Sequence, residues 1–280
     1  MSIMRLSSVA EFLAATENLR ALDPYRTNLI GSVALSIATG SRTYDEYFWW
    51  TISNGEGEIE SLAMRTAPHN LVLIPMNDEA ATELAWHVAR VDPHLPGVSG
   101  PAKTVESFVA AWMSLTKNAL QLSSEELLYT LPLLAPFAVP GKMRKAEIED
   151  LELVTQWTKN FAVEAGLDMP HLESSVLTSL SEGRSFLWEA DNRPVALAGH
   201  APLVSTPSGV VGRIGPVFTP PEFRRNGYAG SLTSALSQQL IDQGSFVMLY
   251  TDASNETSNG VYQRIGFELL DRNKSFTLVK

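Results

Sequence analysis

Apolar residues recur every three to four positions in several stretches of the chain, as they do on the buried face of a helix. In residues 78–91, for example, Ala81, Leu84, Ala85 and Val88 have this spacing. The pattern predicts helices over residues 9–22, 25–39, 78–91, 104–116, 148–166, 171–182 and 227–244.

Short runs of aromatic and β-branched residues between turn sequences predict strands. Residues 47–53 are such a run, and the following Asn54-Gly55 is typical of a hairpin turn. The apolar run 246–250 is typical of a buried parallel strand. Further strands are expected at residues 58–66, 70–75, 95–98, 143–146, 186–190, 194–202, 209–217, 269–271 and 275–279.

The same order of elements occurs twice along the chain: two helices, three strands, a helix, a strand and a helix. The two halves share this order without obvious residue identity. Between them lies a leucine- and proline-rich segment (residues 126–142), a candidate for a strand passed from one half to the other. The sequence therefore predicts an α+β fold of two tandem domains, residues 1–130 and 131–280. Each is expected to hold a mostly antiparallel mixed sheet flanked by helices.

Composition narrows the possible classes of function. The chain has 280 residues, of which 45% are hydrophobic, enough for one large or two ordinary domains. It has no cysteine, which excludes disulfides and thiolate chemistry and is consistent with a cytoplasmic protein. A net charge of −10 argues against a general nucleic-acid binder. Neither a membrane span nor a secretory signal is predicted, and the histidines lack the spacing of metal ligands.

The segment 217–244 is the strongest candidate for a binding site. A predicted strand ends at Pro220-Pro221, a loop carries Arg224 and Arg225, and a helix begins near Gly227. The first N–H groups of a helix have no intrahelical partner and lie at the positive end of its dipole. Small residues would let an anion approach this backbone closely. The alternative is an ordinary strand–loop–helix connection with solvated arginines.

The motif Arg224-x-x-Gly227-x-Ala229 resembles the coenzyme A pyrophosphate loop of the GNAT superfamily of N-acetyltransferases. A second signature of that family follows the next predicted strand: Asn255, then Asn259-x-x-Tyr262-x-x-x-Gly-Phe. The resemblance in motifs covers the second half of the chain. The tandem layout is similar to the glycine N-acyltransferase-like branch, in which only the second domain carries the cofactor loop.

The resemblance implies roles for individual residues. Backbone groups near Val217 and Thr219 would pair with the pantetheine arm, N–H groups after Arg224 would hold the pyrophosphate, and Tyr262 would protonate the leaving sulfur. Asn255 would contact the cofactor or only cap its helix, and Tyr262 could instead be a packing residue. The cofactor-binding residues implied are Val217, Phe218, Thr219, Arg224, Arg225, Asn226, Gly227, Tyr228, Ala229, Gly230, Asn255 and Tyr262.

The general base stays open. Many members of the family use a glutamate on the fourth strand, and residues 209–217 contain none. His200 titrates in the useful range and is one candidate, although a lone histidine on a strand is more often structural. Glu189, Glu222 or a chain of water molecules are alternatives.

The first half lacks the loop. At the corresponding place it reads Ile-Pro-Met-Asn-Asp-Glu-Ala-Ala (residues 74–81), without an Arg-x-x-Gly motif. Asp78 and Glu79 suit the start of a helix but would repel a pyrophosphate. We therefore expect the first domain not to bind coenzyme A.

The resulting prediction is an acyl-CoA-dependent N-acyltransferase that uses acetyl-CoA or another acyl-CoA, without a metal, to modify the amine of a small molecule or amino acid. The partners expected are a small-molecule amine, with no nucleic acid and no membrane. The alternative is a non-catalytic acyl-CoA-binding or regulatory module. An aminoacyl-tRNA-dependent transferase fits less well with the negative charge. The sequence does not indicate the acceptor, the acyl chain length or the oligomeric state.

Overall fold

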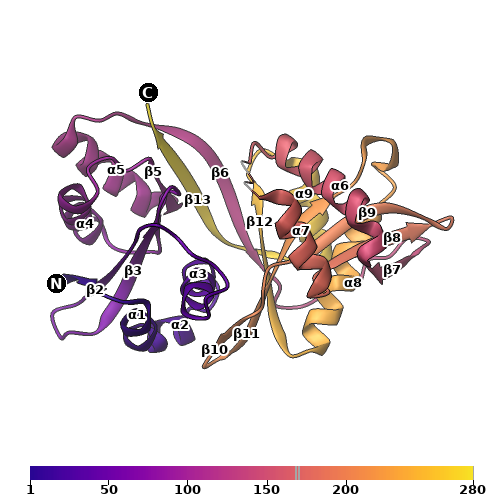
Figure 1. Ribbon diagram of the computed structural model, residues 1–280, viewed down its shortest axis with the longest axis horizontal. Helices are drawn as coiled ribbons and strands as arrows, with labels where there is room; N and C mark the ends of the chain where they lie inside the picture. Colours follow the sequence, from indigo (N-terminus) through magenta and orange to yellow (C-terminus); the bar gives the residue numbers. More distant parts are fainter. Residues whose placement is uncertain (168, 170, 280) are drawn as a thin grey trace. The chain divides into compact units, whose positions relative to one another are not determined.

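The computed structural model describes residues 1–167, 169 and 171–279, which form two compact units (Figure 1). Unit 1 comprises Met1–Leu127, Val204–Gly209 and the C-terminal segment from Asp271. Unit 2 comprises Leu128–Leu203 and Val210–Leu270. Two short segments from the second half of the sequence thus belong to unit 1. Within the described residues, none of the helices combines the length and apolar character that a membrane span requires.

Unit 1 is a mixed sheet with helices on both faces. Its strands are ordered β1-β2-β3-β4-β5-β13-β6, antiparallel from β1 to β4 and parallel between β4 and β5. Its elements are β1 (Ser2–Leu6), α1 (Val9–Ala15), α2 (Glu17–Leu22), α3 (Asn28–Ala38), β2 (Tyr47–Ser53), β3 (Ile59–Thr66), β4 (Leu71–Leu73), α4 (Asp78–Val91), β5 (Gly97–Pro101), α5 (Ala102–Thr116), the start of β6 (Leu120–Thr130), β10 (Val204–Thr206) and most of β13 (Glu268–Leu278).

Two adjacent tryptophans show how the sheet of unit 1 separates two cores. Because successive side chains of a strand point to opposite faces, Trp49 and Trp50 of β2 belong to different clusters. Trp49 stacks on Phe12 of α1, with ring centroids 4.5 Å apart. Trp50 packs among residues of α4 and α5, including Leu84 and Phe108. Both faces of the sheet are therefore buried by helices.

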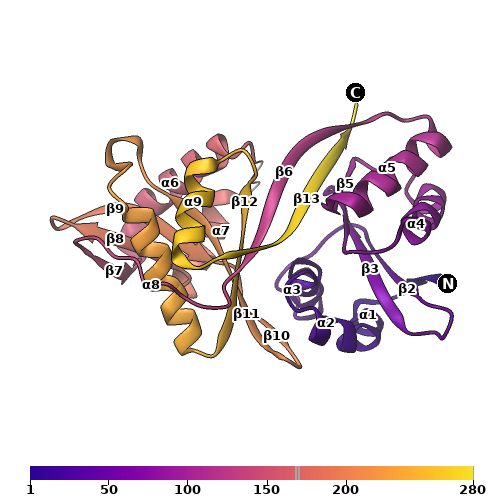
Figure 2. The same cartoon turned by 180° about the vertical axis from the view of Figure 1, so that it is seen from behind.

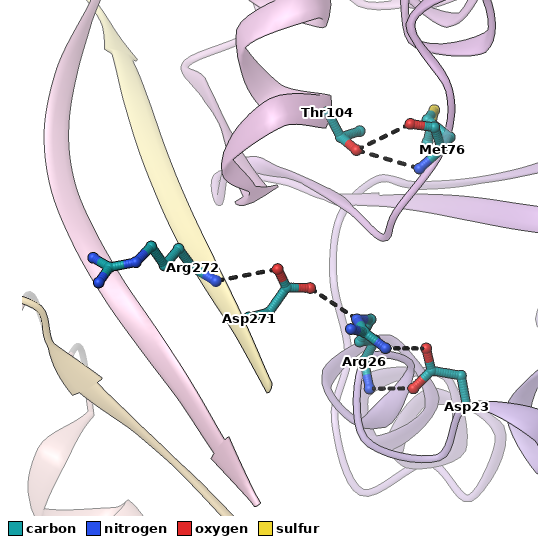
Figure 3. A network of polar contacts seen from close by, with 6 residues as sticks. All are labelled: Asp23, Arg26, Met76, Thr104, Asp271 and Arg272. Carbon is teal, nitrogen blue, oxygen red and sulfur yellow. Dashed lines mark hydrogen bonds and ion pairs between the residues drawn. The ribbon is translucent and has the colours of Figure 1, made fainter. Parts of the chain in front are cut away.

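The C-terminal strand β13 completes unit 1. It pairs antiparallel with β5, from Asn273–Pro101 to Thr277–Gly97. An ion pair fastens its start, since Arg26 Nε lies 2.8 Å from Asp271 Oδ2 while Arg26 Nη1 lies 3.1 Å from Asp23 Oδ2 (Figure 3).

Unit 2 repeats this architecture. Its strands are ordered β12-β11-β9-β8-β7, with the end of β6 beside β12. All neighbours from β7 to β11 are antiparallel, and β11 and β12 are parallel. The elements are β7 (Lys142–Lys145), α6 (Leu151–Glu164), α7 (Leu172–Ser181), β8 (Ser185–Ala190), β9 (Arg193–His200), β11 (Gly209–Phe218), α8 (Tyr228–Asp242), β12 (Ser245–Asp252) and α9 (Glu256–Ile265).

Helices cover both faces of the second sheet as well. Trp157 and Val154 of α6 and Leu180 of α7 form one core with Leu197 and Phe218 of the strands. Helix α8 packs against strands β8, β9 and β12 of this sheet, and it also contacts α9. The observed architecture confirms the predicted fold class of mostly antiparallel mixed sheets flanked by helices.

Several element boundaries differ from the sequence prediction. The expected helix 9–22 is broken at Thr16, whose hydroxyl donates to the carbonyl of Phe12 (2.7 Å). The helix expected at 25–39 begins only at Asn28. The two strands expected after residue 268 are one continuous strand, β13. Strand β6 begins at Leu120, upstream of the segment 126–142 in which a passing strand was expected.

Candidate functional site

The loop before α8 turns sharply through two left-handed residues. Arg225 has φ +64° and Gly227 has φ +80°. Gly227 stands at the N-cap position of α8 and, being glycine, has no side-chain group to cap the helix. Glycine is favoured there because it adopts positive φ without steric cost.

The first turn of α8 therefore presents unpaired donors. In the part of the chain that the structure describes, the backbone N–H groups of residues 227–230 have no hydrogen-bond partner, and the first bond of the helix is from Ser231 N–H to Gly227 C=O (3.0 Å). The first turn also carries no acidic residue. This end of α8 has the donors and the dipole that favour an anion.

The two arginines of the loop differ in their surroundings. The guanidinium of Arg224 is bound on three sides: Nη2 lies 2.6 Å from Glu164 Oε1, Nε donates to the carbonyl of Thr219 (2.9 Å), and the group lies over the Phe218 ring. Arg225 is exposed, and none of the described residues forms a hydrogen bond or ion pair with its side chain. Arg224 thus anchors the loop, and Arg225 is the arginine available to a bound anion.

Strands β11 and β12 separate at the end of the sheet where β11 leads into the loop before α8. Their parallel register runs from Val210–Ser245 to Ile214–Leu249 and, among the described residues, no further. Beyond Ile214, β11 has a register shift against β9 before Val217 pairs with Ala198. The strand edge from residue 215 onward therefore faces β12 without ladder bonds to it. The hydroxyl of Thr219 is buried and has no partner among the described residues.

Helix α9 begins at the end of β12 and carries the second motif. Asn255 caps it, since its side chain accepts from Ser258 N–H (3.0 Å). Asn259 is buried and donates to the carbonyls of Asp252 (3.1 Å) and Ala253 (3.4 Å), which fastens the helix to the strand. Both asparagines thus fix the helix start.

Tyr262 lies on the buried face of α9. Its ring packs edge-on against Phe267, with centroids 5.9 Å apart. Burial raises the pKa of the Tyr262 hydroxyl to about 12. The hydroxyl is therefore protonated throughout the physiological range, as a proton donor must be, although it is a weak acid.

His200 ends β9 directly opposite Ile214, the last residue of β11 that pairs with β12. It is buried, and its Nδ1 lies 2.8 Å from the carbonyl oxygen of Ala201. A proton on Nδ1 would donate to that carbonyl and leave the Nε2 lone pair free. Burial, together with the positive charge of Arg184, lowers the pKa of His200, although the bond to Ala201 acts in the opposite direction. The imidazole is therefore neutral at pH 7.

Comparison with known proteins identifies the architecture. The family model of FR47-like proteins matches residues 203–276. A GNAT-family acetyltransferase of Colwellia psychrerythraea is 13% identical, with a TM-score of 0.60 and 100% of both chains covered. A GCN5-related N-acetyltransferase of Sphaerobacter thermophilus is 16% identical, with a TM-score of 0.62 over 98% of this chain and 94% of that chain. A Drosophila protein is 14% identical, with a TM-score of 0.65 over 99% of this chain and 98% of that chain. The sequence matches no curated protein.

This chain has the GNAT fold. At these identities the likeness concerns the fold, and the chemistry has to be argued from the residues of the site.

The GNAT fold gathers only some of the predicted residues. Residues 224–230 form the loop and first turn of α8, and residues 217–219 end β11, which leads into that loop. Tyr262 is on α9 and His200 on β9, and no described hydrogen bond, ion pair or ring contact joins these two side chains. Glu189, an alternative base, forms ion pairs with Arg144 at 2.6 Å and with Lys142 at 3.7 Å. No cluster of three metal-ligating side chains occurs among the described residues.

Unit 1 contains a counterpart of this site with the opposite chemistry. There α4 follows β4 and leads to the parallel strand β5, as α8 follows β11 and leads to β12. The N-terminus of α4 is closed by its own residues, because Asn77 Oδ1 accepts from Ala80 N–H (2.8 Å). The Thr104 hydroxyl also bonds the backbone N–H of Met76, the residue before the cap (3.2 Å, Figure 3).

Four residues near the loop escaped the sequence reasoning: Phe137, Val139, Ser231 and Ser234. The hydroxyls of Ser231 and Ser234, one helical turn apart on α8, accept from the backbone N–H groups of Val139 (2.8 Å) and Phe137 (3.1 Å). A signal existed in the sequence, because hydroxyl residues at this spacing lie on one helix face. Their partner in the proline-rich segment could not be read from it.

Proposed function

We propose that this chain is an acyl-CoA-dependent N-acyltransferase, with acetyl-CoA as the first donor to test and the amine of a small molecule or amino acid as acceptor. The single observation that carries the proposal is the open first turn of α8, with no acid and with four successive N–H groups that have no partner among the described residues. It is supported by the GNAT fold and by the family match over residues 203–276. We assign the cofactor to the domain 131–280 and take the domain 1–130 to be without one.

The residues present fit an acyl-CoA. The N–H groups of residues 227–230 and the side chain of Arg225 would hold the pyrophosphate, and the free edge of β11 at Val217 and the N–H of Thr219 would face the pantetheine arm. The Thr219 carbonyl is already bound to Arg224, so it contributes less than the sequence alone suggested. When bound, the acyl-CoA supplies a thioester whose acyl group passes to the attacking amine.

The reaction then requires two proton transfers that groups in the site must carry out. The amine nitrogen must lose a proton to a base before or while it forms the new C–N bond, and the sulfur must gain one as the C–S bond breaks. We assign the second to Tyr262, whose hydroxyl is protonated at physiological pH. We assign the first to His200, neutral at pH 7 with Nδ1 bound to Ala201, or to a water chain that needs no single residue.

A non-catalytic acyl-CoA-binding module is the second candidate. The observation that favours it is the buried position of Tyr262, whose ring packs against Phe267 as a core residue would. Burial also raises the pKa of its hydroxyl to about 12, which makes it a weak proton donor. The tandem layout favours the enzyme by its similarity to the glycine N-acyltransferase-like branch.

Amine-dependent release of free thiol from acetyl-CoA separates the two candidates. The assay is a panel of amino acids and small primary amines, read with a thiol-reactive dye against the rate without amine. The enzyme predicts release above that background for at least one amine class. Tight binding of acetyl-CoA without release across the panel would favour the non-catalytic module.

A further inference from the structure

The segment between β6 and β7, residues 131–141, lies along both motif-bearing helices of unit 2, and we call it the strap (Figure 2). Leu131 N–H donates to the carbonyl of Val247 in β12 (3.0 Å), and Ala135 N–H donates to the carbonyl of Ile265 at the end of α9 (2.7 Å). Further along, its N–H groups bind the Ser234 and Ser231 hydroxyls of α8. One extended segment thus bonds in turn to β12, α9 and α8.

The strap also fills the space beside the glycines of the cofactor loop. A Cβ atom added to Gly230 would lie 2.9 Å from Phe137 Cε1 and 3.2 Å from Val261 Cγ1. One added to Gly227 would lie 2.9 Å from Val139 Cγ1. The small residues of the loop therefore make room for the strap, in addition to any approach by an anion.

Gly230 needs this explanation in particular. It lies inside α8, where glycine destabilises a helix relative to alanine, and its φ is not in the left-handed region. Gly260 of α9 offers the contrast, since a Cβ there would meet no atom of the described residues within 4 Å. Close contact with Phe137 is thus one structural reason for glycine at position 230.

We propose that the strap is a positioning element of the acyl-CoA site, with Phe137 and Ser234 as positioning residues. It fixes the first turn of α8, which offers the pyrophosphate its donors, relative to α9, which carries Tyr262. Displacement of a binding group by about 1 Å can cost orders of magnitude in function, so the packing of Phe137 on Gly230 sets cofactor affinity without touching the cofactor. This inference rests on the proposed function.

The test is a set of variants titrated with coenzyme A by calorimetry, each checked for fold by circular dichroism and thermal melting. Gly230→Ala pushes Phe137 away from the first turn and is expected to raise the Kd about tenfold. Phe137→Leu in the same chain shortens the side chain that clashes, and the double variant is expected to return to within about threefold of wild type. Gly260→Ala is the matched control and is expected to leave the Kd unchanged.

Rescue distinguishes positioning from mere stability, because a folded but less stable protein keeps its affinity. If Gly230→Ala does not fold, Ser234→Ala serves instead, since it removes only the acceptor for Phe137 N–H and is expected to raise the Kd about threefold. An unchanged Kd in the folded variants, or a double variant no better than Gly230→Ala, overturns the positioning role. Absence of binding by the wild-type chain instead overturns the proposed function, and the role of the strap with it.

Discussion

Helices α4 and α8 occupy equivalent places in the two units, yet their N-termini have opposite chemistry. Asn77 caps α4, whose first turn carries Asp78 and Glu79, whereas α8 starts at an uncapped glycine and has no acid in its first turn. A helix start that is capped and acidic satisfies its own N–H groups and repels anions, whereas an uncapped start without acids leaves its N–H groups available to an anionic ligand. The same fold can therefore carry a purely structural helix start in one unit and a candidate anion site in the other.

The largest effect should come from giving α8 the chemistry of α4. Ala229→Glu places an acid in the first turn of α8, as Glu79 does in α4. A carboxylate about 4 Å from a pyrophosphate charge costs on the order of 4 kcal/mol in partly buried surroundings, so binding should weaken about 1000-fold. Calorimetric titration with acetyl-CoA measures this change in Kd.

The matched control is Glu79→Ala in α4, which should leave acetyl-CoA binding as it is in the wild type. Undiminished affinity in Ala229→Glu would show that the first turn of α8 does not hold the pyrophosphate.

Tyr262→Phe should have the next largest effect. It removes the hydroxyl and retains the ring that packs on Phe267. Loss of a general acid should lower kcat about 100-fold while the Kd for acetyl-CoA changes little. Steady-state kinetics beside calorimetry provide both values, and a variant with full turnover would make Tyr262 a packing residue.

The pH dependence of activity and of stability tests the role of His200. Because its pKa is lowered, the base form persists at pH 7, and activity that depends on it should fall only below the usual 6.5. The unfolded chain binds the proton more readily than the folded one, so stability should likewise decrease as the pH falls through that region. The pH profile of kcat/KM for wild type and His200→Gln measures this effect. An acid limb that persists in the variant would exclude His200 as the base.

The smallest effects should separate the two loop arginines. Arg225→Ala should weaken acetyl-CoA binding about fivefold, more at low salt, because its exposed charge is free to face the pyrophosphate. Arg224→Ala should instead lower the free energy of unfolding by up to about 1 kcal/mol, since its pair with Glu164 is exposed. Titrations at two salt concentrations measure the Kd of each variant, and chemical denaturation measures its free energy of unfolding. A larger loss of affinity in Arg224→Ala than in Arg225→Ala, or a larger loss of stability in Arg225→Ala, would contradict these assignments.

The sequence was informative where the pattern is local. The bounds of α4 agree with the prediction, and the strand–loop–helix motif at α8 could be read from the proline pair, the glycine and the apolar spacing. The sequence also indicated Asn255 as a possible cap, which its bond to Ser258 confirms.

The remainder depends on contacts between distant residues. Strand β6 has consecutive exposed residues at 121–124 and consecutive buried residues at 127–129, so no alternation of apolar and polar positions marks it as a strand. The small edge strand β1 was missed for a similar reason, since most of its residues are exposed. Likewise, the anchoring of Arg224 by Glu164 and the packing of Phe137 on Gly230 join residues far apart in the chain.

The most direct test of the central claim is a calorimetric titration of the intact chain with acetyl-CoA. The contrast between α4 and α8 predicts a single binding site per chain, lost in Ala229→Glu and retained in Glu79→Ala. No binding, a second site of equal strength, or a site that survives Ala229→Glu would contradict it.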